Sequence, residues 1–235
     1  MTYYLYIILG LIPSMVWLLF YLRKDSHPES SSMILKIFFY GMIATVPVAL
    51  IEIGFKELLS GFEMPELLHS IVYLFLGVAF FEEFIKFLVI KGKVFKSAAL
   101  DEPVDVMLYM IIAALGFAAA ENILILFSLG PTFLIAETIS ITAFRFIGAT
   151  FLHALCSGLV GFFLALSFYQ LNKRNWFLAF GLVTATLLHG LYNFSIIRDT
   201  SGEGFIIPLL ILISLALFIT FAFKKLKKIK SICKI

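Results

Sequence analysis

The chain has 235 residues, of which 62% are hydrophobic and only 14% are charged, with a net charge of +3. Soluble domains carry about 45–50% apolar and about 25% charged residues, so this composition excludes a soluble globular protein. It predicts an all-α, polytopic bundle of membrane-spanning helices in a lipid bilayer, with no nucleic-acid partner. Cys156 lies in an apolar segment and Cys233 in a lysine-rich tail. Their depths differ too much for pairing, and we expect neither a disulfide nor a cysteine-based metal site.

Seven apolar segments follow one another, each close to the ~20 residues that a spanning helix needs. Their predicted bounds are about 3–22, 33–55, 67–90, 104–128, 135–171, 176–197 and 205–223. The first has no basic leader and no clear cleavage site, so we interpret it as a retained span. Pro47 predicts a kink in the second span, and residues 56–65 are expected to form a loop. Pro103 predicts the first turn of the fourth span, with Asp101 or Glu102 as its cap.

The basic residues predict the orientation in the membrane. One set of loops and ends holds most of them: Arg23, Lys24, Lys36, Lys91, Lys93, Lys96, Lys173, Arg174 and six lysines in the tail after residue 223. The opposite loops hold only Lys56 and Arg198. Because cytoplasmic loops carry the excess of Lys and Arg, we expect the N-terminus outside and the C-terminus in the cytoplasm.

The stretch Glu82-Glu83-x-x-Lys86 lies inside the third predicted span. A charged side chain near the centre of a spanning helix costs about 2.5–3.5 kcal/mol on insertion scales, so such residues face a cavity or pair internally. On a helix Lys86 is i,i+4 from Glu82 and i,i+3 from Glu83 and can reach either carboxylate. We interpret Lys86 as a structural counter-ion to the two glutamates.

Other spans add polar residues of their own: Glu121, Asn122, Arg145, His153, His189 and Asn193. At ~1.5 Å per residue, His153 falls near the middle of its span. Glu82 falls ~5 Å to the cytoplasmic side of its midpoint, whereas His189 and Glu121 fall ~4–8 Å to the outer side of theirs. These depths allow one shared site without requiring it. We expect Arg145 to pair with Glu121 or a glutamate of the third span, and Asn122 to form a hydrogen bond between helices.

Glutamates and histidines in an apolar pocket suit one kind of chemistry. A carboxylate there can act as a general base, and histidines can polarise a carbonyl, stabilise an oxyanion or bind a metal with the glutamates. The sequence has no Ser-His-Asp pattern, no Gly-rich phosphate loop and no His-Glu-x-x-His motif. Water-mediated peptide hydrolysis fits this set of side chains best.

The ordered motifs resemble those of the PrsW family of membrane-embedded proteases. The resemblance covers roughly residues 80–195 and rests on Glu82-Glu83-x-x-Lys86, Phe117-x-x-x-Glu121-Asn122, Phe144-Arg145 followed by His153, and His189-x-x-x-Asn193. The segment Asp101-Glu102-Pro103-x-Asp105 is also similar. Two positions depart from the common pattern: Val106 stands where glycine is common, and Asn193 where aspartate also occurs. Neither departure removes a candidate catalytic group.

This resemblance implies roles for individual residues. Glu82 and Glu83 would be the catalytic pair, one activating water and the other orienting it or sharing a metal. His153 and His189 would be metal ligands or oxyanion partners. The implied zinc ligands are Glu83, His153 and His189, and a mechanism without metal stays open. Lys86, Glu121, Asn122, Arg145 and Asn193 would support the site.

The resemblance also implies an organisation and a substrate. We expect one integral membrane domain over residues 1–235, with a catalytic core at about 67–197, peripheral spans and a basic cytoplasmic tail at 224–235. The implied activity is an endopeptidase of the cytoplasmic membrane that cuts a single-pass membrane protein near the outer face. An anti-sigma factor is the expected substrate, in the first cut of regulated proteolysis.

Two other classes of function stay open at this point. A non-catalytic scaffold or assembly subunit would retain histidines without the glutamate pair, and the intact Glu82-Glu83 disfavours it. A proton-coupled transporter would also place Glu and His inside the membrane. Transporters of that kind usually show an internal repeat, and the two halves of this sequence show no convincing one.

Overall fold

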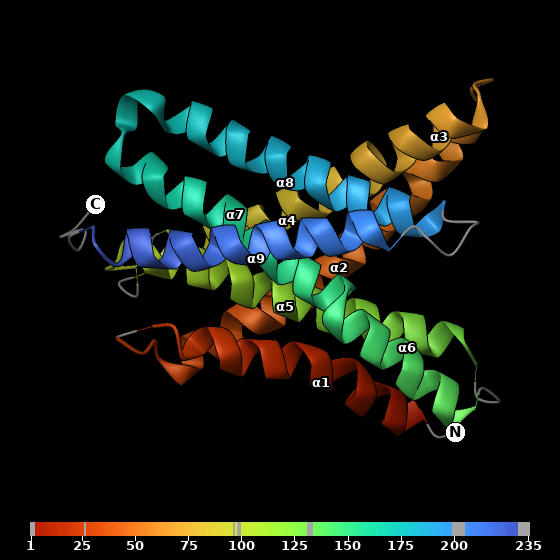
Figure 1. Cartoon of the computed structure of the whole chain (residues 1–235), viewed down its shortest axis with the longest axis horizontal. Coiled ribbons are helices and arrows are strands. Elements are labelled where there is room, and N and C mark those ends of the chain that lie inside the picture. The colour runs from red at the N-terminus through yellow and green to blue at the C-terminus, as the bar shows by residue number, and fades with distance from the viewer. Residues whose placement is uncertain are drawn as a thin grey trace.

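The computed structural model describes residues 3–25, 27–95, 97, 100–130, 134–198 and 205–229. Its regular elements in these ranges are all helical (Figure 1): α1 Tyr3–Leu22, α2 Ser31–Ser60, α3 Glu66–Val72, the π-helix η1 Tyr73–Phe80, α4 Phe81–Lys93, α5 Pro103–Ser128, α6 Ile135–Ile147, α7 Ala149–Tyr169, the 3₁₀ turn η2 Leu171–Lys173, α8 Arg174–Ile197 and α9 Ile206–Leu226. The predicted all-α membrane bundle is confirmed. Cys156 is buried as a free thiol, whereas Cys233 lies outside the described residues.

Six helical stretches of the described chain are long and apolar enough to cross a membrane: Tyr3–Leu22, Ser31–Ser60, Pro103–Ser128, Ile135–Tyr169, Leu171–Ile197 and Ile206–Leu226. The remaining predicted span, 67–90, is divided into α3, η1 and α4, which follow one another without a break. The first turn of α1 and the last turn of α9 lie at opposite ends of the bundle (Figure 1). A seventh crossing and the orientation in the membrane stay predictions.

The expected loop at 56–65 is wrong in its first half. Helix α2 continues through Lys56 to Ser60, and the backbone N–H of Gly61 caps it by bonding to the carbonyls of Leu58 and Leu59. Lys, Glu and Leu are good helix formers, so this polar stretch extends the helix by more than a turn. The predicted span at 135–171 is also interrupted: α6 ends at Ile147 and α7 begins after Gly148.

The fourth span begins as predicted. Pro103 is the first residue of α5 and Glu102 is its N-cap. Asp105 reaches back from the first turn, and its Oδ2 accepts the backbone N–H groups of Glu102 at 2.6 Å and Asp101 at 3.2 Å. These bonds satisfy donors that the start of a helix leaves free. The Asp-Glu-Pro-x-Asp segment therefore defines where α5 enters the bundle.

Helix α5 forms the centre of the bundle, and its residues from Pro103 to Ala119 are all buried. It packs against α1, α2 and α7 (Figure 1). Helix α2 approaches closely at Gly41, where an added Cβ would clash with the backbone carbonyl of Ala113 on α5. Small residues at a helix interface let backbones approach in this way.

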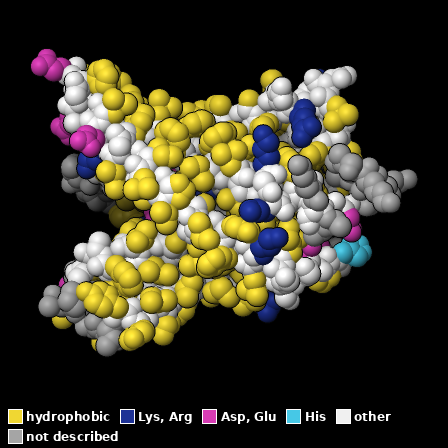
Figure 2. Space-filling model, turned by 180° about the vertical axis from the view of Figure 1, so that it is seen from behind, with side chains coloured by type: hydrophobic (Ala, Val, Ile, Leu, Met, Phe, Trp, Pro, Cys, Tyr) yellow, Lys and Arg dark blue, Asp and Glu magenta, His cyan; other side chains and the backbone are white. Residues whose placement is uncertain are grey.

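The outer surface fits a bilayer. Figure 2 shows a broad hydrophobic area across the middle of the molecule and most Lys and Arg side chains of this face toward one end. The C-terminal ends of α1 and α9 and the start of α8 lie at that same end (Figure 1). Large apolar side chains such as Leu50, Ile53 and Leu217 are more than 60% exposed, as expected for side chains that face lipid.

The close α2–α5 contact generates a first prediction. Gly41→Val should destabilise the bundle by about 1–3 kcal/mol, the range for overpacked cores, because the Ala113 carbonyl is backbone and cannot turn aside. Gly54→Val is the matched control on the same helix, since an added Cβ there meets nothing within 4 Å. Unfolding in a detergent titration would compare the two. Equal stability of the two variants would contradict the packing.

Candidate active site

The polar residues of the third predicted span lie at the start of α4, directly after the π-helix η1. A π-helical turn makes i→i+5 hydrogen bonds and often occurs at functional sites. Glu82, Glu83 and Lys86 are between 0% and 3% exposed. Two neighbouring helices supply histidines, His153 from α7 and His189 from α8, each 2% exposed. The structure therefore brings together residues from three elements that are far apart in the sequence.

Lys86 lies inside the cluster and contacts both glutamates and His153. Its ammonium donates to Glu83 Oε1 at 2.9 Å and to Glu82 Oε2 at 3.1 Å, and it lies 2.9 Å from Nδ1 of His153. The Nζ also lies 4.4 Å from the centre of the Phe117 ring. Buried charges remain stable only when they are paired and hydrogen-bonded. Lys86 is thus the counter-ion of both glutamates, as the spacing predicted.

A second group of side chains orients His153. Its Nε2 lies 2.8 Å from Glu121 Oε2, and the same oxygen accepts a hydrogen bond from Arg145 at 2.9 Å. A carboxylate paired with Arg is ionised and only accepts hydrogen bonds, so Nε2 of His153 carries the proton. Its Nδ1 therefore accepts a hydrogen bond from the Lys86 ammonium. The expected Arg145–Glu121 ion pair is present.

Asn122 connects this second group to two other helices. Its Nδ2 donates to Thr150 Oγ1 on α7 at 3.0 Å and to the Gly10 carbonyl on α1 at 3.4 Å. Its Oδ1 accepts from Nε of Arg145 at 2.5 Å. Asn122 is therefore the hydrogen bond between helices that the sequence predicted, and it also positions Arg145.

Glu83 orients His189 in the same way that Glu121 orients His153. Glu83 Oε1 lies 3.1 Å from Nδ1 of His189, and Oε2 accepts a hydrogen bond from Ser157 at 2.7 Å. The ionised carboxylate accepts, so Nδ1 of His189 donates and Nε2 keeps its lone pair, 4.0 Å from Glu82 Oε2. Both oxygens of Glu83 are engaged. Among the described residues, Lys86 donates to Glu82 Oε2, and none donates to Glu82 Oε1.

Close packing between α8 and η1 next to His189 lets this histidine approach the glutamates of α4. Gly190 follows His189 on α8, and a Cβ there would lie 2.7 Å from the ring of Phe75 on η1. The missing side chain lets η1 pack directly on α8, which brings the glutamates of α4 against the histidine. Ligand atoms of Glu82, Glu83, His153 and His189 all lie within 4.8 Å of one another.

Comparison with known proteins agrees with this geometry. Residues 29–222 match the family described as "PrsW family intramembrane metalloprotease". The chain belongs to this family. It is 28% identical over 226 residues to Protease PrsW of Bacillus subtilis (strain 168), which covers 95% of this chain and 94% of that protein. No solved structure matches the chain.

Two further relatives carry the same name. Protease PrsW of Geobacillus kaustophilus (strain HTA426) is 28% identical over 174 residues, 74% of this chain and 71% of the relative. Protease PrsW of Oceanobacillus iheyensis is 26% identical over 204 residues, 87% and 88% of the two chains. This member of the PrsW family is therefore a membrane-embedded endopeptidase, a multi-pass hydrolase of the cell membrane. The resemblance predicted from the four motifs is confirmed.

The metal that the family name implies can be tested against these side chains. Imidazole nitrogens and carboxylate oxygens are the ligands that zinc prefers, and the cluster supplies all of them from buried residues. Nε2 of His189 presents its lone pair beside Glu82, and the lone pair of His153 Nδ1 faces Lys86. The donor set therefore fits a divalent metal. The Lys86 ammonium lies at hydrogen-bond distance from three of the same residues, so it occupies space that a metal would share.

Sequence reasoning missed two polar side chains near the cluster. Ser157 is one helical turn after His153 on α7 and bonds to Glu83, but a lone serine in an apolar span carries no signal of its own. Glu52 of α2 is half-buried and interacts electrostatically with Glu82 and Glu121; its position in an apolar span was the signal. Asn193 is half-buried one turn beyond His189 and makes no hydrogen bond with the described residues of the cluster.

Lys86 allows a direct test of the charge balance in the cluster. Lys86→Met should destabilise the protein by about 3–5 kcal/mol, because it leaves two buried carboxylates without their cation. Lys91→Met, on the exposed side of the same helix, is the matched control and should change stability little. Detergent-induced unfolding of the two purified variants measures the difference. A Lys86→Met protein as stable as the control would show that the cluster does not depend on this ion pair.

Proposed function

We propose that Glu82, Glu83, His153 and His189 form the catalytic centre of this endopeptidase. The observation that supports the proposal is their convergence: four buried side chains from α4, α7 and α8 place ligand atoms within 4.8 Å of one another. Lone polar residues inside membrane bundles commonly serve as contacts between helices. Two carboxylates and two imidazoles that share one point in an apolar interior make a reactive site instead.

The hydrogen bonds of the two glutamates support a different role for each. Glu82 has a free carboxylate oxygen, so it is the group that accepts a proton from the attacking water. The water oxygen then adds to the carbonyl carbon of the peptide, the C–N bond breaks, and Glu82 returns the proton to the departing amine. Glu83 has no free oxygen and orients His189. Glu121 orients His153 in the same manner, as outer carboxylates do for catalytic and metal-bound histidines.

Zinc is the proposed metal. His153 and His189 would hold it with a carboxylate of the glutamate pair, and it would supply Lewis-acid activation of the water and the scissile carbonyl. The resemblance to the PrsW family implied Glu83 as the carboxylate ligand; the unbonded Oε1 of Glu82 supports Glu82 for the contact with water. Lys86 stabilises the negative charge of the pair in either case.

The proposed substrate is a single-pass membrane protein, specifically an anti-sigma factor. The resemblance to the PrsW family supports this substrate, and a cluster inside an apolar bundle favours a peptide that reaches it from the bilayer. The proposed cut lies near the outer face of the membrane, as the first step of regulated proteolysis. No described loop is long enough to form a separate substrate-binding domain.

Replacing each glutamate by its amide tests the catalytic centre. Glu82→Gln should lower cleavage by about 10²–10⁴-fold, the contribution of a general base. Glu83→Gln should also abolish detectable cleavage, because a neutral amide leaves one acceptor oxygen where the carboxylate offers two charged ones to His189, Ser157 and Lys86. Glu63→Gln, exposed between α2 and α3, is the control. The measurement compares protein N-termini in membranes and culture medium of host cells at matched protein abundance. New termini just outside a single-pass span, lost in both site variants, would name the substrate. Unchanged termini in Glu82→Gln would exclude Glu82 as the base.

Metal removal tests the zinc proposal separately. The purified protein should contain about one zinc per chain, and His153→Ala together with His189→Ala should lose it. A chelator should abolish cleavage in detergent, and zinc but not magnesium should restore it, since magnesium prefers oxygen ligands. Elemental analysis and a cleavage assay on the same samples provide both readouts. A fully active protein without metal would overturn the zinc proposal and leave the role of Glu82 standing.

A further inference from the structure

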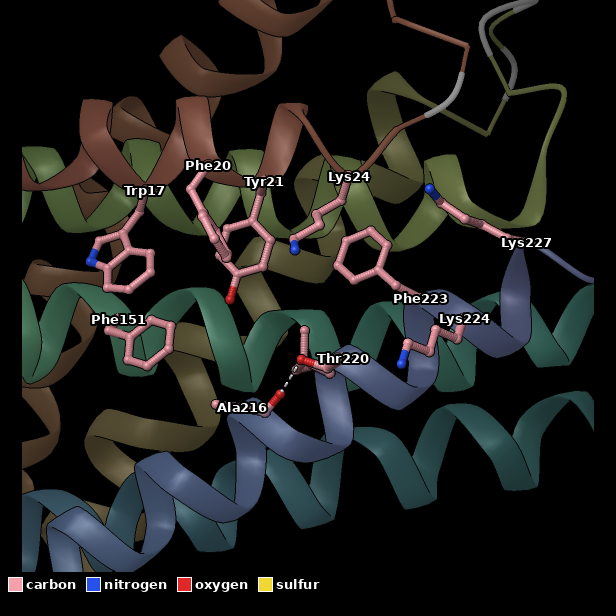
Figure 3. A pocket seen from close by; sticks show the side chains of 11 residues that line it. Trp17, Phe20, Tyr21, Lys24, Phe151, Ala216, Thr220, Phe223, Lys224 and Lys227 are labelled. Atoms are coloured by element: carbon pink, nitrogen blue, oxygen red, sulfur yellow. Dashed lines mark hydrogen bonds between the residues drawn. The ribbon is translucent and has the colours of Figure 1, made fainter.

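A separate cavity lies between α1 and α9, away from the catalytic cluster. It has a volume of about 340 Å³, and Phe151 of α7 also lines it. Figure 3 shows its two different ends: Trp17 and Phe151 lie at one, and the lysine side chains Lys24, Lys224 and Lys227 lie toward the other. We call this cavity the α1–α9 groove. Nothing in the proposed protease chemistry uses it.

The apolar end of the groove is rigid. The rings of Trp17 and Phe151 stack with centroids 4.0 Å apart and planes 10° apart. The indole Nε1 of Trp17 donates a hydrogen bond to the Phe146 carbonyl at 2.9 Å. These contacts hold the indole in place as one wall. The groove therefore has a preformed apolar section and not a loose gap between helices.

The basic end lacks a carboxylate partner within the described chain. Lys24, Lys224 and Lys227 are exposed, and no ion pair joins any of them to an acidic residue of the described ranges. Lys24 Nζ lies 4.7 Å from the Phe20 ring, so it leans toward the groove wall. Three positive charges at the C-terminal ends of α1 and α9 thus surround one opening. This arrangement is complementary to a ligand with negative charge.

The spacing between the two ends matches an amphipathic ligand. Trp17 and Lys24 are seven residues apart, which corresponds to ~10 Å along the helix axis, well within one leaflet of a hydrocarbon core ~30 Å thick. Such a ligand has its charge at the level of the lysines and its apolar part ~10 Å deeper. A free phosphate would leave the apolar section unused. A transmembrane helix would need carboxylates to match the lysines.

We propose that the α1–α9 groove binds an anionic glycerophospholipid of the leaflet on the basic side of the protein. The phosphate and headgroup contact Lys24, Lys224 and Lys227, and an acyl chain lies along Tyr21 and Phe223 toward Trp17. Basic pockets between membrane helices recognise anionic headgroups in this way. The site would give the protein a fixed lipid between its first and last described helices.

The tryptophans make the proposal measurable. The chain has only two, Trp17 and Trp176, and Trp176 is 58% exposed at the start of α8. In the full-length Trp176→Phe protein, Trp17 is the sole emitter. The protein is placed in phosphatidylcholine bilayers containing a small fraction of dibrominated phosphatidylglycerol or dibrominated phosphatidylcholine, whose bromines quench tryptophan on contact. The anionic lipid should reach half-maximal quenching at a mole fraction about fivefold or more below that of the neutral lipid.

Two triple variants separate the groove from general surface charge. Lys24→Gln, Lys224→Gln and Lys227→Gln together should abolish the preference for the anionic lipid. Arg23→Gln, Lys225→Gln and Lys228→Gln remove the same charge from exposed positions outside the groove and should retain it. Equal quenching by both lipids, or an equal loss in both triple variants, would overturn the proposal. So would a copurifying protein that shields Trp17 from both lipids. The readout does not depend on proteolysis.

Discussion

The site depends on how buried charges are compensated inside an apolar bundle. Two carboxylates on adjacent residues of one helix repel each other, and neither can be left without a partner in this interior. Lys86 provides one cation to both, from the same helix and within one turn, and so the pair can exist before any other helix is in place. The histidines then contact carboxylates whose charge Lys86 has already compensated in part. This arrangement explains why Glu-Glu-x-x-Lys forms one compact motif.

The side chains around the cluster orient the groups that are proposed to react. Each histidine has one ring N–H that donates a hydrogen bond to a carboxylate, Glu121 for His153 and Glu83 for His189. The opposite nitrogens point to a common place beside Glu82. Arg145 keeps Glu121 ionised, and Asn122 holds Arg145 while bonding to α1 and α7. The tautomers of both rings thus follow from ion pairs that lie outside the reacting atoms.

Much of this organisation could be predicted from the sequence, because the signals were chemical. Charges inside apolar segments are costly, so Glu82, Lys86 and Arg145 stood out, and the i,i+3 and i,i+4 spacing gave Lys86 its partners. The division of 67–90 into α3, η1 and α4 could not be predicted, because a π-helical turn changes the hydrogen-bond register without a marker in composition. Ser157 was missed for a related reason: its value comes entirely from a neighbour 74 positions away in the chain.

The predicted depth of a residue within its own span was a weak guide to which residues meet in the site. The predicted midpoints placed Glu82 and His189 on opposite sides of the membrane centre, yet Glu82 Oε2 and His189 Nε2 are 4.0 Å apart. Helices tilt to suit their neighbours, and here the contact between Gly190 and Phe75 determines how closely α8 approaches the glutamate helix. Local periodicity shows which face of a helix is polar. Only packing between helices decides which polar faces meet.

Residues at the end of α6, next to the break at Gly148, contact both Glu121 near the cluster and helix α1. Arg145 and Phe146 are adjacent at the end of α6: the Arg145 side chain reaches Glu121 near the cluster, while the Phe146 carbonyl accepts the indole N–H of Trp17 on α1. Asn122 adds a second link to α1 through the Gly10 carbonyl. Helix α1 carries none of the candidate catalytic residues, yet it holds both sides of the Arg145–Glu121 pair in position. A span that looks peripheral in the sequence is therefore part of the framework that orients His153.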